Sequence, residues 1–231
     1  MMLNGATAEN ITVNGAIVGN DGVGGIAGRL VIDGTIANCT NNASVTSSYG
    51  GIGGIVGKAY YEDGANTATF ASITNCTNKG TIKAPMYVGG IAGLARANVS
   101  GCVNEGAIVG GTQTGGIVGQ VYGSGSKFVF EKINVAKSTT ISGHWGTWDV
   151  SAGGVIGRTA DGVTVEMNDV YVACVLDVYN DVCAAYQWYA YRYSGMLVGY
   201  TKTTAKTESG ATVATAPHVK CTNVTVEYGD W

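Results

Sequence analysis

The chain has 231 residues and a formal net charge of −3, and only 13% of its residues are charged, against about 25% in a typical soluble domain. With 37 glycines, two prolines, 45% hydrophobic residues and a mean hydropathy of +0.16, it is too apolar for a disordered chain and lacks the composition of collagen. The four arginines are far apart in sequence and no apolar run reaches the roughly 18 residues of a membrane helix, so neither a nucleic-acid surface nor membrane insertion is expected.

The main signal along the chain is a glycine repeat: two glycines, an aliphatic residue, a small or aliphatic residue, and a third glycine. Its copies lie at residues 24–28, 53–57, 89–93, 115–119 and 153–157, with a degraded copy at 195–199. The copies are separated by 29, 36, 26, 38 and 42 residues. Self-similarity on this scale is typical of repeat architectures.

A second pattern, cysteine, any residue, asparagine, alternates with the glycine repeat. It occurs at Cys39/Asn41, Cys76/Asn78, Cys102/Asn104 and Cys221/Asn223. The first three cysteines lie 14, 13 and 13 residues before the next glycine pair, whereas the distance from a glycine pair to the next cysteine is 15, 23 and 13 residues. The segment from the cysteine to the next glycine pair is therefore nearly constant in length. The segment from the glycine pair to the next cysteine tolerates surface insertions, which we place at residues 58–70 and 120–132.

A unit of about 26 residues cannot bury its own apolar face, so successive units must stack. The abundance of valine, isoleucine, threonine and tyrosine favours strands. We therefore predict an all-β fold, a right-handed parallel β-helix of five to six coils with like positions about 4.8 Å apart. The aliphatic residue after each glycine pair should point inward and form a column. The asparagines should form a ladder at a turn, and Cys39, Cys76 and Cys102 a reduced, inward ladder of small hydrophobic side chains.

The sequence predicts one solenoid domain over residues 1–231, with regular coils at 10–120 and irregular coils at 121–231. The segment at residues 10–19 resembles the second half of a repeat and that at 221–229 the start of another. We expect the chain to be a piece of a longer surface protein. Cys174 and Cys183 are nine residues apart and could form a disulfide, an alternative to free thiols.

Aromatic residues are the main irregularity, because 15 of the 20 lie after residue 120. In the fifth and sixth repeats they lie between the cysteine position and the next glycine pair. Stacking of the coils would place these two aromatic insertions on the same side of the solenoid, one coil apart. Tyrosine, tryptophan and arginine are enriched at binding hot spots. The predicted contact residues are Trp145, Trp148, Tyr186, Trp188, Tyr189, Tyr191, Arg192 and Tyr193. The alternative is that these rings cap the end of the core.

The Gly-Gly-Ile-x-Gly pattern with an intervening Asn-Cys-Thr-Asn resembles the GLUG-type repeats of bacterial cell-surface proteins, over about residues 10–200. Such repeats also occur in non-catalytic regions of some immunoglobulin A peptidases. The resemblance implies a secreted or wall-attached module used for display or binding, with no active site. The zinc motif of those peptidases, His-Glu-x-x-His, is absent from this sequence.

The glycine repeats miss the spacing of a dinucleotide-binding loop by one residue, and no cofactor or metal is expected. The expected function is a non-enzymatic surface module, compatible with a monomer, that binds a host protein such as an immunoglobulin or mucin, or a glycan. A second hypothesis is a carbohydrate-active β-helix enzyme using Asp161, Glu166 or Asp169, since lyases and glycosidases use grouped carboxylates. Glu166 and Asp169 have opposite parity, so a straight strand would turn them to opposite faces. A third hypothesis is a passive spacer.

Overall fold

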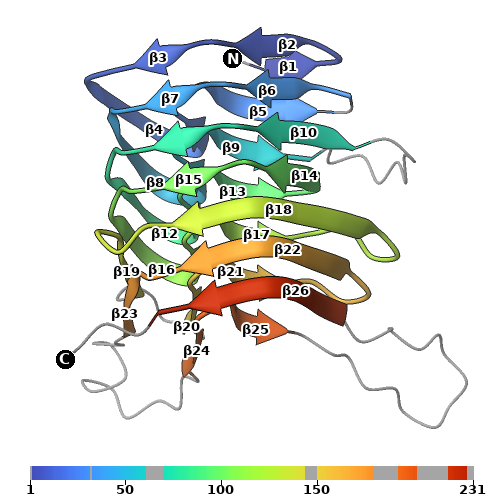
Figure 1. Cartoon of the computed structure of the whole chain (residues 1–231). Helices are drawn as coiled ribbons and strands as arrows, with labels where there is room; N and C mark the ends of the chain where they lie inside the picture. The colour runs from blue at the N-terminus through green and yellow to red at the C-terminus, as the bar shows by residue number, and fades with distance from the viewer. Residues whose placement is uncertain are drawn as a thin grey trace, which may run out of the picture.

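The computed structural model describes residues 2–31, 33–60, 70–143, 150–178, 192–201 and 218–227. All of the regular secondary structure assigned within these ranges is β-strand, which confirms the all-β prediction. No helix in the described part of the chain has the length and apolar character needed to span a membrane. Parallel strands from successive repeats form three sheets that run along the molecule (Figure 1).

Each sheet takes one segment from every turn of the chain. Sheet A contains β1 (Met2–Asn4), β5 (Ala27–Val31), β9 (Val56–Ala59), β13 (Ala92–Ala95), β17 (Val118–Val121), β21 (Ile156–Thr159) and β25 (Val198–Thr201). Sheet B contains β2 (Thr7–Glu9), β3 (Thr12–Val13), β6 (Thr35–Ala37), β7 (Thr40–Asn41), β10 (Ala71–Thr74), β11 (Thr77–Asn78), β14 (Ala97–Ser100), β15 (Val103–Asn104), β18 (Lys127–Val135), β22 (Thr164–Val172) and β26 (His218–Val226). Sheet C contains β4 (Ala16–Gly24), β8 (Ser44–Gly53), β12 (Ile82–Gly89), β16 (Ile108–Gly115), β19 (Thr140–Gly143), β20 (Val150–Gly153), β23 (Val175–Val178) and β24 (Arg192–Gly195).

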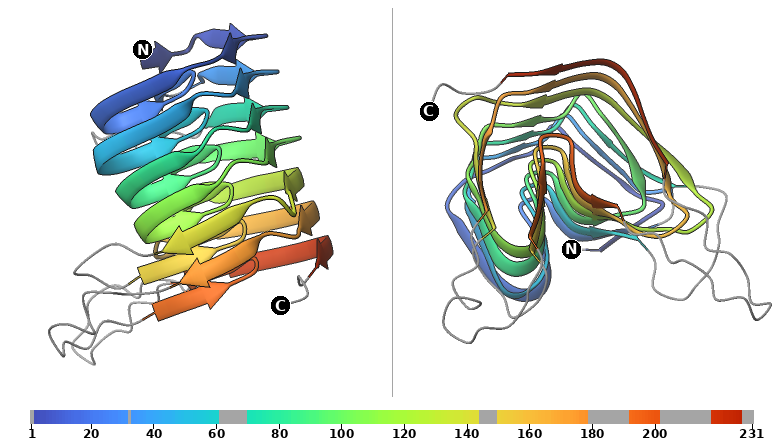
Figure 2. Two further views of the ribbon diagram at one scale, coloured as in Figure 1. Left: turned by 90° about the vertical axis from the view of Figure 1, so that its left-hand side faces the viewer. Right: turned by 90° about the horizontal axis from the view of Figure 1, so that it is seen from below.

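One turn passes along sheet B, then sheet C, and reverses sharply at the glycine pair into sheet A. The described strands complete six such turns, from β2–β5 to β22–β25, while β1 precedes the first turn and β26 follows the last. Seen from the C-terminal end, the chain runs counter-clockwise as it approaches the viewer, so the solenoid is right-handed (Figure 2). The reversal at the glycine pair indents the cross-section, and the core lies between sheet B and this indentation.

The glycines are required by close backbone approach. A Cβ on Gly54 would lie 2.3 Å from the Gly90 carbonyl oxygen and 2.4 Å from the Oδ1 of Asn78. A Cβ on Gly57, the third glycine of the same repeat, would lie 2.5 Å from the Val23 amide nitrogen of β4. Real Cβ atoms do not approach this closely, so only glycine lets the reversal pack against its neighbours.

The aliphatic residues after the glycine pairs form the predicted column. The Ile26 amide donates to the Ile55 carbonyl at 2.9 Å, Ile55 to Ile91 at 3.1 Å, and Ile91 to Ile117 at 2.9 Å. Ile55, Ile91 and Ile117 are fully buried, and Ile26 of the first turn is half-buried. The stacking predicted from the repeat spacing is confirmed.

The asparagines also form a ladder, but inside the core rather than at a left-handed turn. Asn41, Asn78 and Asn104 are fully buried, and each side-chain amide bonds the carbonyl two residues ahead. Left-handed backbone is adopted instead by the residue before each cysteine, with φ of 53° at Asn38 and 51° at Asn75. This residue bends sheet B between its two short strands, because asparagine tolerates positive φ.

The register corrects two sequence alignments. The repeat pattern would place Ala136 in the cysteine position of the fifth coil, but Asn134 pairs with Val103, so Ile133 occupies it. Cys221 pairs with Met167, three positions before the cysteine column, which Val224 occupies in that rung. The predicted insertion at 120–132 is also shorter than expected, since β18 begins at Lys127. Any apolar residue of suitable size fills the column, so the cysteine is not diagnostic of the position.

Candidate binding site

Most of the aromatic residues predicted from the sequence lie outside the described residues. These are Trp145, Trp148, Tyr186, Trp188, Tyr189 and Tyr191. Arg192 and Tyr193 begin strand β24, whose backbone pairs with β20. The contacts of these eight side chains therefore stay a prediction from sequence.

The structure does define where the two aromatic segments are attached. In the first four turns sheet C is a single strand, but in the fifth it is split between Gly143 and Val150 and in the sixth between Val178 and Arg192. Gly143 pairs with Val178, and Val150 pairs with Arg192. The two segments therefore leave adjacent rungs and return to adjacent rungs of the same sheet, as expected from stacked coils.

A second aromatic group, which was not predicted from the sequence, lies where sheet A turns into sheet B. Tyr60, Arg96 and Tyr122 each follow the third glycine of their repeat by three residues. The Arg96 amide donates to the Ala59 carbonyl and the Tyr122 amide to the Ala95 carbonyl, which places the three on successive rungs. The Tyr60 and Tyr122 ring centroids are 6.0 Å apart, and 53% of Tyr122 is exposed. The constant offset from the glycine triplet could have identified this group.

Arg96 also contacts Phe70, the ring that immediately precedes strand β10 of sheet B. Its guanidinium carbon lies 5.5 Å from the centroid of Phe70, and Phe70 packs edge-on against the buried Phe128 at 4.9 Å. This cation–π contact and ring pair anchor the corner to the core. The group formed by Tyr60, Phe70, Arg96 and Tyr122, called here the corner cluster, combines aromatic and cationic surface.

Two of the three carboxylates considered for an enzyme, Glu166 and Asp169, contact other side chains. Glu166 accepts a 2.9 Å contact from the Lys127 ammonium, and this hydrogen bond lowers the pKa of Glu166. Asp169 accepts a hydrogen bond from the Asn223 side-chain amide. The prediction that Glu166 and Asp169 face opposite sides is wrong, because the φ of 55° at Asp169 shifts the alternation and leaves both on the outer surface.

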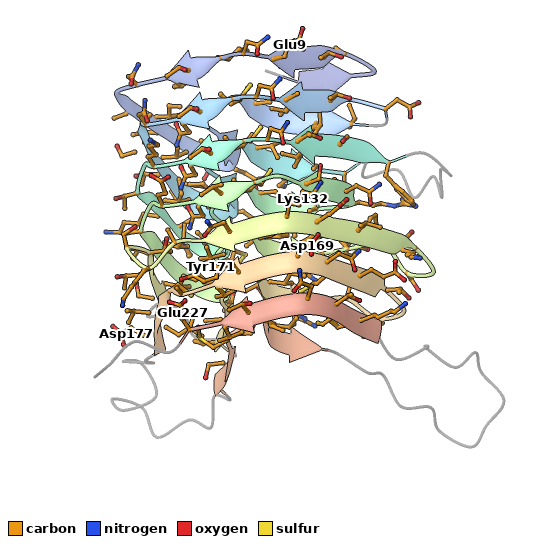
Figure 3. The ribbon with its side chains drawn as sticks, in the orientation of Figure 1. Glu9, Lys132, Asp169, Tyr171, Asp177 and Glu227 are labelled. Carbon is orange, nitrogen blue, oxygen red and sulfur yellow. The ribbon has the colours of Figure 1, made fainter. Side chains whose placement is uncertain are left out.

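Outer side chains of sheet B pair across rungs in the same way. Figure 3 shows Lys132, Asp169, Tyr171 and Glu227 on this outer face. The hydrogen bond that the Tyr171 hydroxyl donates to Glu227 raises the pKa of Tyr171. Tyr171 and Glu227 lie on neighbouring rungs of the sheet surface and engage each other, an arrangement typical of cross-strand pairing.

The described cysteines are free thiols. Cys39, Cys76 and Cys102 are buried, and their Sγ atoms donate to the carbonyl two residues back at 3.1, 3.2 and 3.3 Å. The hydrogen bond with Cys76, together with burial, raises the pKa of Cys102 well above its usual value, and burial raises the pKa of Cys174 to about 11. Cys183, the suggested partner of Cys174, lies outside the described residues. No group of three or more potential metal ligands occurs among the described histidine, cysteine and acidic residues.

Comparison with solved structures finds the same fold elsewhere. The crystal structure of a protein from Bacteroides ovatus, named there a "putative immunoglobulin A1 protease", superposes with a TM-score of 0.63 at 20% sequence identity, covering 94% of this chain and 67% of that one. At this identity the likeness shows the fold alone. No protein-family model matches the chain, and no curated protein matches it either. The similarity to GLUG-type repeats therefore stays a resemblance of motif.

Proposed function

We propose that this chain is a non-enzymatic module of a bacterial surface protein that binds a host macromolecule through the aromatic segments of its fifth and sixth coils. The observation that carries the proposal is the pairing of Gly143 with Val178 and of Val150 with Arg192. It tethers residues 144–149 and 179–191 to the same flank of a solenoid at adjacent rungs. Binding residues are often carried on loops held by a regular scaffold.

The composition of the two segments supports a contact surface. Together with the start of β24 they contain three tryptophans, four tyrosines and an arginine among the eight predicted residues. Such residues supply large contact area at low entropic cost. Anchors of this kind bind mainly by burial of aromatic surface, so binding should depend only weakly on salt.

The partner is proposed to be a host protein such as an immunoglobulin or mucin, or a glycan, and the module to be secreted or attached to the cell surface. The repeat motif resembles that of bacterial surface proteins, and the Bacteroides ovatus structure of the same fold carries the name "putative immunoglobulin A1 protease". A glycan partner would use the same chemistry, because flat aromatic rings stack on sugars.

The test is capture from host secretions with the wild type and with Trp188→Ala/Tyr191→Ala, followed by identification of what is lost. Binding of the captured partner should weaken by about 2 kcal/mol or more, roughly 30-fold in Kd. Tyr122→Ala is the matched control, since Tyr122 is 53% exposed on the corner cluster at the junction of sheets A and B. Unchanged binding by the double variant would support a passive spacer, and loss of binding near 1 M salt would exclude the aromatic mechanism.

A carbohydrate-active enzyme is the second candidate function, and its support is the presence of the carboxylates Asp161, Glu166 and Asp169. A glycan-degradation screen with Glu166→Gln and Asp169→Asn separates it from the binding module. Turnover that disappears in either variant would favour the enzyme. Because Glu166 contacts Lys127 and Asp169 accepts from Asn223, we expect both variants to leave any glycan unmodified, like the wild type.

A further inference from the structure

Sheet C folds back on itself within each turn, and the successive bends form a rounded edge that runs along the solenoid (Figure 2). A Cβ on Gly19 would lie 2.7 Å from the Val23 side chain, and a Cβ on Gly110 would overlap the Thr114 hydroxyl, so the two limbs of a strand face each other closely. In the first four turns the bend contains one residue with positive φ at equivalent register positions, namely Gly22, Gly51, Tyr87 and Gln113.

Six residues on this bend in the first three turns combine aromatic, apolar and uncharged polar side chains. Tyr49 is 55% exposed, and none of the six belongs to the hydrophobic core. The Ser48 hydroxyl donates to the Oδ1 of Asn20 at 2.7 Å, which leaves the Asn20 amide nitrogen as a donor on the surface. The group is called here the bend strip, and it consists of the exposed residues Asn20, Ser48 and Tyr49 and the half-buried residues Pro85, Met86 and Tyr87.

Tyr87 occupies a position that favours glycine. Its φ is 53°, and the first two turns have Gly22 and Gly51 at the same position, with φ of 62° and 63°. Left-handed backbone is strained for a residue with a bulky side chain, and such strain is concentrated at functional sites. The third turn therefore keeps an aromatic ring at a bend that glycine would form without strain, which points to a role for the ring.

The bend strip offers side chains rather than main chain for recognition. Strands β8 and β12, which carry five of its six residues, each have a neighbour on both sides in sheet C. An extended peptide that adds a strand needs an unpaired edge, and these interior strands have none. The adjacent carboxylate of Asp21 is paired with the Lys58 ammonium at 2.6 Å, so the strip presents rings, a hydroxyl and an amide without net charge.

We propose that the bend strip binds a neutral, linear glycan whose sugar rings stack on Tyr49 and Tyr87. Because Gly50 pairs with Met86, the two tyrosines are one coil and two residues apart, roughly 8 Å or less between their Cα atoms. One chain of sugars that follows the edge can therefore use both rings. The Asn20 amide donates to sugar hydroxyls, and the Ser48 hydroxyl accepts from them.

Glycan binding at the strip rests on the proposed function and deepens it, because it selects the glycan among the proposed partners. Gly110, beside the bend of the fourth turn, pairs with Gly143, and Gly143 pairs with Val178. The strip therefore lies on the flank to which residues 144–149 and 179–191 are attached. A stable protein–protein interface takes about 20 to 30 residues from each partner. Six residues along an edge fit a narrow polymer better than a folded protein.

Titration of the full chain with neutral oligosaccharides tests the site. The probes are short linear oligosaccharides of hexose and N-acetylhexosamine units, and binding is followed by calorimetry. We expect at least one probe to bind with a Kd of about 1 mM or lower, and Tyr49→Ala to weaken it about tenfold. Tyr122→Ala, which removes a tyrosine that is 53% exposed at the corner cluster, is the matched control and should bind like the wild type. A wild type that binds no probe at this level would overturn the proposal.

Tyr87→Gly separates the ring from the backbone that holds it. Glycine adopts the positive φ without strain, so the melting temperature should change little, whereas affinity for the oligosaccharide should fall about tenfold. Tyr87→Phe keeps the stacking surface and should retain most of the affinity. A lower melting temperature of Tyr87→Gly with unchanged affinity would make the ring a packing element and would contradict its role in binding.

The failure of this site and the failure of the proposed function give different results. Oligosaccharide binding that is lost in Tyr49→Ala but kept in Trp188→Ala/Tyr191→Ala would support the strip and count against the aromatic segments. A host protein that is captured after enzymatic deglycosylation, and lost in Trp188→Ala/Tyr191→Ala but not in Tyr49→Ala, would leave the proposed function standing and overturn glycan binding at the strip.

Discussion

The side-chain amide of Asn41 donates a 2.9 Å hydrogen bond to the Oδ1 of Asn78, which lies one coil further along the solenoid. Asn78 repeats the contact with Asn104 at 2.8 Å and also donates to the Gly80 carbonyl at 3.0 Å. The column continues with Val13 on one side and Val135 on the other, so the buried ladder has apolar ends. A buried amide column is tolerated because its members satisfy one another.

Replacing the central member should therefore be costly. Asn78→Ala removes its bonds to both neighbours and to Gly80, and we expect the free energy of unfolding to fall by about 3 kcal/mol. Chemical denaturation measures this loss. The exposed Asn42, whose amide bonds Asn14 at 2.9 Å, is the matched control, and Asn42→Ala should cost about 0.5 kcal/mol or less.

The same ladder predicts strong non-additivity. Converting all three asparagines to valine removes the side-chain donors and acceptors of the ladder together, and the chain already has valine in this column at Val135 and Val172. The triple variant should therefore lose much less than the sum of the three single Asn→Val changes. Additive losses would show that each amide acts independently of its neighbours.

The glycine pair yields a prediction about packing. Gly54→Ala places a methyl group against the Gly90 carbonyl and the Asn78 side chain, and backbone on adjacent coils cannot move aside cheaply. We expect a loss of about 3 kcal/mol. Gly125 has a positive φ of 75°, and no atom lies within 4 Å of the place that an added methyl group would take, so Gly125→Ala isolates the conformational cost, about 1 kcal/mol. Similar losses in both variants would remove the packing explanation.

The sequence predicted those features in which one residue type recurs over several consecutive coils. The Ile55 column follows the glycine pairs and the Asn78 ladder recurs in three consecutive coils, so their spacing is visible in the repeats. The cysteine position accepts Cys102 or Ile133 equally well, and the motif is lost where isoleucine stands. Cys221 matched the pattern by chance, although Asn223, with its positive φ, is the real equivalent of Asn38.

The candidate sites were likewise predicted from the sequence only in part. The attachment of both aromatic segments to one flank follows from counting residues between repeats. The corner cluster was not predicted, although Tyr60 and Arg96, which are 36 residues apart, have the same offset from the third glycine of their repeats. The position of Glu166 and Asp169 on the same face was not predicted either. It depends on the positive φ at Asp169, which strict strand alternation does not take into account.

The contact between Phe70 and Phe128 allows the stability contribution of a core ring to be compared with that of a ring nearer the surface. Phe128 is fully buried, whereas Phe70 is half-buried. Phe128→Ala should lower the free energy of unfolding by about 4 kcal/mol, and Phe70→Ala by about 1 to 2 kcal/mol, mostly through the lost ring contact. Thermal or chemical denaturation of the two variants and their double mutant measures the coupling. Full additivity would mean that the edge-on contact contributes nothing.

The buried thiol of Cys174 predicts how stability changes in alkaline solution. Burial raises its pKa to about 11 from an ordinary value of 9.0, so the folded state holds the thiol proton more tightly than the unfolded chain. The associated stability is fully present below about pH 9 and is lost as the pH rises toward 11, with a limit of about 3 kcal/mol.

Measuring the free energy of unfolding between about pH 8 and pH 10.5 in the wild type and Cys174→Ala tests this linkage. Tyrosines and lysines titrate in both chains, so the informative quantity is the difference between the two curves. The wild type should lose more stability with rising pH, and the gap between the chains should narrow. Parallel curves would mean that the Cys174 thiol titrates alike in both states, and the side chain would then contribute through packing alone.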